Sequence, residues 1–141
     1  MNIPHSEEEK EEDFLEYLYM GWKSGTEIWP HQVKMHLELM DAELKRLERG
    51  LMESGYLRKR AENSGYRLTE LGKVQGEECL LRHHNLTQFL QMTCGLEEEE
   101  AEENACRMEH VISGNVLQGV QEFLKYGETY DRVVRDVDLR Y

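Results

Sequence analysis

The chain has 141 residues, of which 39% are hydrophobic and 33% charged, and its net charge is −12. This length suits one compact unit or two small lobes, and no apolar run approaches the roughly 18 residues that span a bilayer. The acidic N-terminus lacks the apolar core of a secretory signal, and the three cysteines are an odd, unevenly spaced set. We therefore expect a folded cytoplasmic protein that has no disulfide framework and no membrane segment.

The negative charge is concentrated in two segments. Residues 1–16 carry seven acids against one lysine, and residues 97–109 carry seven acids against one arginine, so each segment has a net charge of −6. Within residues 41–60, by contrast, six cations outnumber four acids. The overall charge therefore predicts weak non-specific DNA binding, but it does not exclude DNA contact through one local surface.

The first part of the chain is predicted to form helices. Ser6 followed by Glu9 is a capping box, and apolar residues then recur at helical spacing, which predicts a helix to about Lys23. Pro30 suits the first turn of a second helix that runs to about Leu39. Both predictions use only neighbouring residues, so they do not depend on an assumed fold.

A third helix and a hairpin are predicted next. Asp41 can cap the third helix, and Gly55 ends it. Residues 56–60 and 66–68 are short strand-like pieces around an Asn/Ser/Gly tip, which predicts a β-hairpin. Three helices followed by a hairpin is the order of a winged helix-turn-helix, in which one helix enters the major groove and the hairpin reaches phosphates.

The basic residues of this region are the candidate DNA contacts. They are Lys45, Arg46 and Arg49 of the third helix and Arg58, Lys59 and Arg60 of the hairpin. The alternative is an ordinary solvated helix face with ion pairs along it, for instance Arg46 with Glu43. Asp41 and Glu43, in the leading turn of the third helix, would meet phosphates unfavourably.

The second half of the chain is predicted to be helical throughout. Thr69 caps a long helix to about Met92, a helix over residues 96–112 follows, and Ser113 can cap a last one. The segment after Gly127 is left unassigned. The expected fold is mainly α, with a winged helix-turn-helix DNA-binding domain over residues 1–71 and an all-helical domain over residues 72–141.

Side chains that ligate divalent metals recur at helical spacing. The candidate ligands are Asp13 and Glu16 on the first helix, His83 on the fourth, and Cys106, Glu109 and His110 on the fifth. The first pair and the last three each share one helix face, and together the six would complete a mixed O/N/S shell for a transition metal. Each also has an ordinary alternative, because acidic runs are usually solvated, a lone cysteine packs as a small hydrophobe, and His84 suits the site as well as His83 by composition.

Three segments resemble the family of the diphtheria toxin repressor and the manganese transport regulator. They are YRLTELG (66–72), LRHHNLTQFL (81–90) and ENACRMEHVIS (103–113), which resemble the family patterns RLTxxG, RHxLLxxFL and ExxCxxEHxxS. Residues 12–19 (EDFLEYLY) also resemble the opening helix of the family, so the resemblance covers about residues 8–125. It implies a metal-activated, dimeric transcriptional repressor whose N-terminal half binds DNA and whose helical C-terminal half dimerises and completes the metal site.

Carried over by position, the resemblance implies the same six ligands. Asp13 and Glu16 resemble the manganese branch of the family, whereas Cys106 resembles the iron-responsive branch. The expected cofactor is therefore Fe(II) or Mn(II). A soft thiolate favours iron, hard carboxylates suit manganese, and intrinsic affinity favours iron of the two.

The sequence also departs from the family pattern. Thr87 replaces a carboxylate of the ancillary site of the iron-responsive branch, and Glu102 stands where that branch has a histidine, so an ancillary site is expected only in altered form. The second and third helices lack the usual Ser-Pro-x-Ser-Val entry, so the operator is expected to differ from family norms. We expect this chain to be too short for the SH3-like third domain of the longer members.

These inferences lead to one main hypothesis and two rivals. We expect a homodimer that binds a palindromic operator and represses metal-uptake genes, with recognition helices about 34–36 Å apart. The apolar residues expected to need cover in a dimer are Leu86, Phe89, Leu90, Val116, Val120 and Phe123. One rival is a winged-helix adaptor that regulates through a protein partner without metal. The other is a small metal enzyme, for which the sequence offers no second Glu-x-x-His and no nucleophile constellation, so we expect no catalysis.

Overall fold

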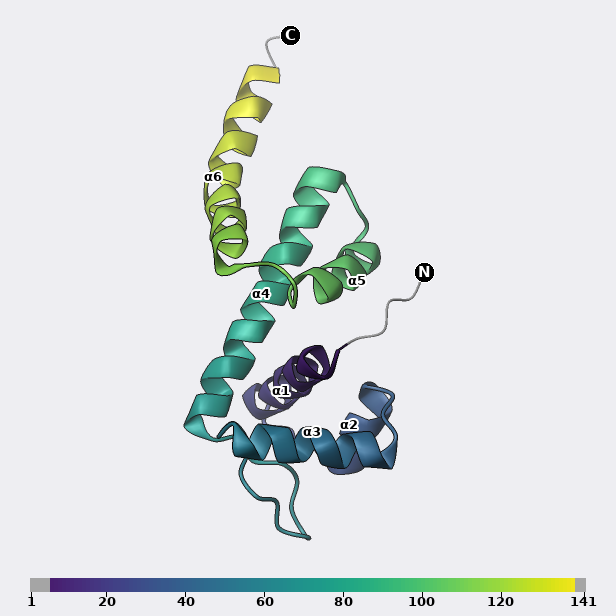
Figure 1. Ribbon diagram of the computed structural model, residues 1–141. Helices are drawn as coiled ribbons and strands as arrows, with labels where there is room; N and C mark the ends of the chain where they lie inside the picture. The colour runs from purple at the N-terminus through teal and green to yellow at the C-terminus, as the bar shows by residue number, and fades with distance from the viewer. Residues whose placement is uncertain (1–5, 139–141) are drawn as a thin grey trace. The chain divides into compact units, whose positions relative to one another are not determined.

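The computed structural model describes residues 6–138, with side chains for residues 6–126, and is mainly helical as predicted (Figure 1). Its helices are α1 (Glu7–Lys23), α2 (Pro30–His36), α3 (Asp41–Glu53), α4 (Glu70–Cys94), α5 (Glu98–Met108) and α6 (Gly114–Asp138). The chain divides into two compact units, Met1–Leu80 and Leu81–Tyr141, and the division falls within α4. The domain boundary predicted between residues 71 and 72 stays a prediction. Among the described helices, none has the length and apolar character needed to cross a bilayer.

The first helix has the predicted start and end. The backbone N–H of Glu9 donates to Ser6 Oγ at 3.2 Å, which satisfies one of the free donors of the first turn. α1 ends at Lys23. Its apolar positions Phe14 and Leu15 are fully or almost fully buried in the core of the first unit.

The turn between α2 and α3 differs slightly from the prediction. α2 ends at His36 instead of near Leu39, because Glu38 adopts a left-handed backbone with φ 54° that breaks the helix. Asp41 is the first helical residue of α3 and not its cap; the cap is Met40, whose backbone N–H donates to Glu43 Oε1 at 3.4 Å. A tight connection of this kind between two short helices is typical of a helix-turn-helix.

The predicted hairpin forms an extended loop, which Figure 1 shows after α3, and not two regular strands. Within the described residues its arms are joined by a single antiparallel bridge, Leu57 with Leu68, and by the bond from Arg58 N–H to the Arg67 carbonyl at 2.9 Å. Beyond Arg58 the pairing stops because the Arg60 guanidinium takes up carbonyls of the loop tip. The sequence prediction of strands was therefore too regular, although the two arms do meet.

A third extended segment, which the sequence analysis missed, lies beside the loop. The Tyr66 N–H donates to the Ile28 carbonyl at 2.8 Å, so the residues between α1 and α2 pair with the second arm. The Glu27 carboxylate supports the same contact by accepting the Gly65 N–H at 2.7 Å. The loop is thus fixed to the body of the first unit on this side.

The core of the first unit joins all of these elements. It contains Phe14, Leu15, Leu18, Tyr19, Ile28, Val33, Leu39, Leu44, Leu47, Leu51, Leu57, Tyr66 and Leu68. A fully buried side chain of this size contributes about 1.5–3 kcal/mol to folding. The first turns of α4 approach α1 closely at Gly76, where an added Cβ would lie 2.6 Å from the Cβ of Tyr19, so glycine is required there.

The second unit has its own core, formed by the C-terminal part of α4 with α5 and α6. The buried residues are Leu86, Leu90, Ala101, Ala105, Val120 and Leu124. α5 ends at Met108, earlier than the predicted Ile112, and the N–H groups of Val111 and Ile112 turn back to the Met108 carbonyl. Ser113 caps α6 as predicted, because its Oγ accepts the Val116 N–H at 3.3 Å, and α6 continues to Asp138.

This core corrects part of the expectation about apolar cover. Leu86, Leu90 and Val120 are buried inside the unit, since α5 and α6 pack on α4, so they need no partner chain. Val116 and Phe123 are 51% and 44% exposed and remain available on α6.

Candidate metal centre and DNA-binding surface

A buried carboxylate lies between two imidazoles in the second unit. The Glu109 side chain is 1% exposed, and its Oε1 lies 3.2 Å from His110 Nε2 and 3.9 Å from His83 Nδ1. His83 comes from the middle of α4, whereas Glu109 and His110 follow the last turn of α5. The fold therefore brings together three of the predicted ligands from two segments distant in the sequence.

Cys106 joins the same cluster from inside α5. One ligand atom each of Cys106, Glu109 and His110 lies within 4.8 Å of the others. The expectation that these three share one face of a single helix is corrected in one respect, because only Cys106 lies within α5. Their spacing still brings them together, since Glu109 caps the helix with a right-handed helical backbone (φ −57°, ψ −29°) and so continues its geometry for one more residue.

His83 and His84 differ in their surroundings. His84 is exposed, whereas His83 Nδ1 is buried and makes no hydrogen bond within the described residues; its 3.9 Å separation from Glu109 is too long for one. A buried imidazole nitrogen without a hydrogen bond is costly unless something else binds it. With a carboxylate, a second imidazole and a thiol beside it, the donor set fits a divalent transition metal.

Two further predicted ligands, Asp13 and Glu16, lie on α1 in the first unit. They are almost one helical turn apart and both are partly buried, so they share one face of α1 as the sequence analysis expected. Their part in the metal centre stays a prediction.

Thr87, which replaces an ancillary-site carboxylate in the resemblance, has a local role here. Its Oγ1 donates to the His83 carbonyl at 2.8 Å, one turn back in α4, and its side chain is buried. The hydroxyl is therefore used inside the helix.

The acids at the start of α3 are each matched by a lysine. Asp41 lies 2.6 Å from the Lys34 ammonium, whose hydrogen bond lowers the pKa of the carboxyl below its ordinary value. Glu43 lies 2.6 Å from Lys10, and this bond likewise lowers the pKa of Glu43. The expected repulsion between these acids and DNA phosphates is thereby reduced.

Ion pairing also divides the candidate DNA contacts on α3. Arg46 Nε lies 2.6 Å from Glu7 Oε1, so the ion-pair partner of Arg46 is on α1. Glu43, the partner given as an example in the alternative interpretation, pairs with Lys10 instead. Lys45 and Arg49 are exposed on α3. Arg46, which pairs with α1, therefore differs in environment from Lys45 and Arg49.

The cations of the loop differ in the same way. Arg60 Nη1 donates to the carbonyls of Ala61, Glu62 and Ser64 at 3.0–3.3 Å, so it shapes the loop tip. Arg58 and Lys59 are exposed beside it. The six predicted DNA contacts thus stay a prediction, but Arg60 has a structural role as well.

One link between α3 and the loop escaped the sequence analysis. The Tyr66 hydroxyl donates to the Glu48 carboxylate, and burial together with this bond raises the pKa of Tyr66 above its ordinary value. A mixed-charge helix gives no sign of which glutamate reaches a distant tyrosine. The pair fixes the basic loop relative to the predicted recognition helix.

Comparisons with known proteins agree with this arrangement. Residues 69–132 match the family model described as "Iron dependent repressor, metal binding and dimerisation domain". The chain is 28% identical over 115 residues to an uncharacterised HTH-type transcriptional regulator of Methanocaldococcus jannaschii, covering 81% of this chain and 91% of that one. It is 25% identical over 126 residues to the HTH-type transcriptional regulator MntR of Oceanobacillus iheyensis, covering 89% and 84%.

The fold also matches solved structures. The manganese regulator SloR superposes with a TM-score of 0.73 at 22% identity, covering 82% of this chain but only 54% of SloR, so the chain spans about half the length of that structure. The matched family model, the two transcriptional regulators and this shared fold all agree with the motifs in α1, α4 and α5. Residues 69–132 are thus similar to the metal-binding and dimerisation domain of iron-dependent repressors, and most of the chain is similar to HTH-type transcriptional regulators.

Proposed function

We propose that this protein is a metal-dependent transcriptional repressor that binds palindromic operator DNA as a homodimer, with Fe(II) or Mn(II) as its cofactor. The observation that carries the proposal is the buried Glu109 carboxylate next to His83 and His110, with Cys106 in the same cluster. These residues lie within the segment that matches the metal-binding and dimerisation family model.

The proposed ligand set adds Asp13 and Glu16 of α1 to the four residues of the second unit. Bound there, the cation would supply the positive charge that neutralises three carboxylates and a thiolate. The sequence resemblance and the shared helix face of the α1 pair support this addition.

Contacts inside the first unit offer a route from α1 to the DNA-binding surface. Glu7 pairs with Arg46 and Lys10 pairs with Glu43, so two ion pairs join α1 to α3. Whatever fixes α1 therefore also restrains the predicted recognition helix. A ligand that favours the DNA-competent arrangement shifts the population in proportion to its differential affinity for that arrangement.

The proposed homodimer rests on the second unit. Val116, Phe123 and Tyr126 leave large apolar surfaces exposed on α6, and Leu81 does so on α4. A small domain with several such side chains gains stability from a partner surface. Light scattering at micromolar concentration should give the mass of a dimer, and a monomer both with and without metal would contradict this part of the proposal.

A selection experiment tests the whole proposal, because the operator is unknown. Random-sequence DNA duplexes are selected on the purified protein in parallel with anaerobic Fe(II), with Mn(II) and with a chelator. We expect a palindrome to be enriched with metal and not with the chelator, and its affinity to fall as salt rises, since the basic residues displace condensed counterions.

Two other outcomes distinguish the rivals. Equal enrichment with the chelator would favour a metal-independent winged-helix regulator. If no DNA is enriched under any condition but elemental analysis finds metal bound to the protein, the metal centre would be supported and the repressor function contradicted.

A further inference from the structure

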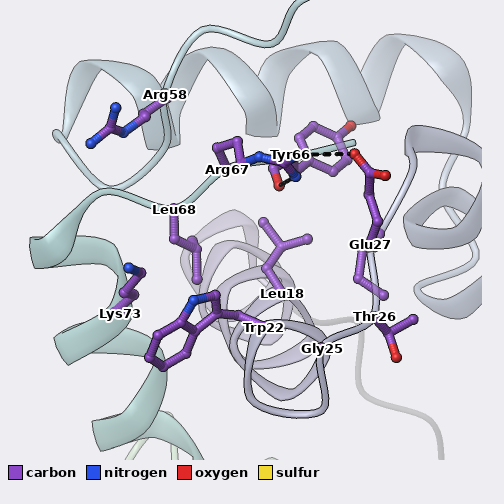
Figure 2. A pocket seen from close by; sticks show the side chains of 11 residues that line it. Leu18, Trp22, Gly25, Thr26, Glu27, Arg58, Tyr66, Arg67, Leu68 and Lys73 are labelled. Atoms are coloured by element: carbon purple, nitrogen blue, oxygen red, sulfur yellow. Dashed lines mark hydrogen bonds and ion pairs between the residues drawn. The ribbon is translucent and has the colours of Figure 1, made fainter. Parts of the chain in front are cut away.

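The first unit has a cavity of about 620 Å³ that the metal centre does not use. Figure 2 shows it between the end of α1, the arms of the basic loop and the start of α4. Leu18 and Leu68 line it, and the exposed indole of Trp22 lies at one side. Cavities of this size hold small organic molecules.

The charge on the cavity wall is opposite in sign to that of the whole chain. Arg58, Arg67 and Lys73 line it, and the one acid among the lining residues is Glu27. The Glu27 carboxylate already accepts the Gly65 N–H at 2.7 Å and lies 3.1 Å from Arg67 Nη2. The lining residues therefore include three cations and one acid, and Lys73 Nζ also lies 3.1 Å from Glu70 Oε1 outside the lining. Arg58 adds a cation for which the described residues show no ion pair, in a protein whose net charge is −12.

The same wall offers a flat aromatic surface. Lys73 Nζ lies 4.5 Å from the centroid of the Trp22 ring, so a cation and an indole form adjoining parts of the cavity. Trp22 is 52% exposed, which leaves indole surface open to another molecule. Aromatic rings stack on such a surface in an offset arrangement, and a carboxylate attached to the ring would reach the nearby cations.

We propose that this cavity binds a small organic anion with an aromatic ring, held by Trp22 through stacking and by Arg58 and Lys73 through charge. Duplex DNA fits the observations less well, because its bases are paired and stacked inside the helix and none is available to lie on Trp22. The proposal does not rest on the metal centre or on the repressor function, although Arg58 is also a predicted DNA contact.

The test is isothermal titration calorimetry of the full chain with 2-naphthoate, with the uncharged 2-naphthamide and with inorganic phosphate. We expect 2-naphthoate to bind with a Kd below about 1 mM and the other two to bind at least about tenfold more weakly. The Arg58→Gln and Lys73→Gln variants should each weaken 2-naphthoate binding by roughly tenfold. The Lys59→Gln variant should bind like the wild type, because Lys59 is exposed on the same loop but does not line the cavity.

The Trp22→Leu variant separates stacking from charge. It should lose 2-naphthoate binding by roughly tenfold while circular dichroism shows an unchanged fold. Absence of heat from 2-naphthoate up to about 10 mM would overturn the proposal. So would equal affinity for the naphthamide, equal affinity for phosphate, or the same loss in the Lys59→Gln variant.

Discussion

Two sets of carboxylates in this protein have the same chemistry and opposite surroundings. Asp41 and Glu43, at the start of α3, each lie 2.6 Å from a lysine ammonium near the surface. Glu109, after α5, is buried with two imidazole nitrogens within 3.9 Å of its Oε1. Lysine neutralises a carboxylate permanently, whereas imidazole nitrogens are themselves metal ligands. The neighbours of a carboxylate, more than its place in an acidic run, therefore decide whether it can hold a metal.

Removing an imidazole from the Glu109 cluster should have the largest effect. In the His110→Ala variant we expect metal affinity to fall by about 100-fold or more and metal-dependent DNA binding to be lost, because a buried carboxylate would lose an adjacent ligand. Calorimetric titration with Co(II) measures the first effect and anaerobic gel shift the second. The matched control is His84→Ala, an exposed histidine beside His83, which should retain both properties. Unchanged Co(II) affinity in the His110→Ala variant would remove His110 from the centre.

Replacing the thiol should change the choice of metal more than the affinity. The Cys106→Glu variant would have a shell of oxygen and nitrogen ligands only, so the ratio of Fe(II) to Mn(II) affinity should fall by roughly tenfold. DNA binding titrated with each ion under anaerobic conditions measures this ratio. The control is Cys94→Ser, since Cys94 is exposed at the end of α4. An unchanged ratio would show that Cys106 does not ligate the activating metal.

The sequence was sufficient to predict what depends on local signals. Ser6 and Ser113 cap helices as predicted because a cap requires only a hydroxyl three residues before an N–H. The cluster of Cys106, Glu109 and His110 also follows from spacing within one segment. Composition and spacing left His83 and His84 of α4 equally suitable, and only the family resemblance favoured His83.

What the sequence did not predict depends on tertiary contacts. The strands of the loop were overestimated because nothing local shows that Arg60 occupies the tip carbonyls. The alternative of ion pairs along α3, for instance Arg46 with Glu43, could not include Glu7 and Lys10 of α1, which pair with these two residues. Leu86 and Leu90 were assigned to a dimer surface although α5 and α6 already cover them.

The paired and the exposed cations of α3 should differ in their contribution to DNA binding. Lys45→Gln and Arg49→Gln should each reduce the slope of log affinity against log salt by about 1, because each removes one phosphate contact. Arg46→Gln should reduce it less, since Glu7 already neutralises Arg46. Fluorescence anisotropy at several salt concentrations, on the duplex selected above, measures these slopes. Lys125→Gln, on α6, is the control and should leave the slope unchanged. If Arg46→Gln reduces the slope as much as Lys45→Gln does, DNA displaces Glu7 from Arg46.

The smallest expected effect concerns the pH dependence of the Lys10–Glu43 pair. The hydrogen bond from Lys10 lowers the pKa of Glu43 from its ordinary 4.5, so the folded state binds that proton less readily than the unfolded state. The stabilisation by this carboxylate is therefore fully present above about pH 4.5 and is lost as the pH falls through the lower folded value. Urea unfolding of the wild type and of the Glu43→Gln variant, from pH 7 to about pH 3.5, measures the difference in stability.

The wild type should be the more stable protein at pH 7, and the difference should shrink as acid protonates Glu43. It should also shrink at pH 7 as salt is raised, because both side chains are partly exposed and their attraction is screened. Glu102→Gln serves as the control, since Glu102 is exposed in the acidic run of α5. The difference in stability between Glu102→Gln and the wild type should not show the same decrease as the pH falls. A constant difference between wild type and Glu43→Gln at every pH would mean that the variant acts through packing, and the ion pair between α1 and α3 would then have no measurable role in stability.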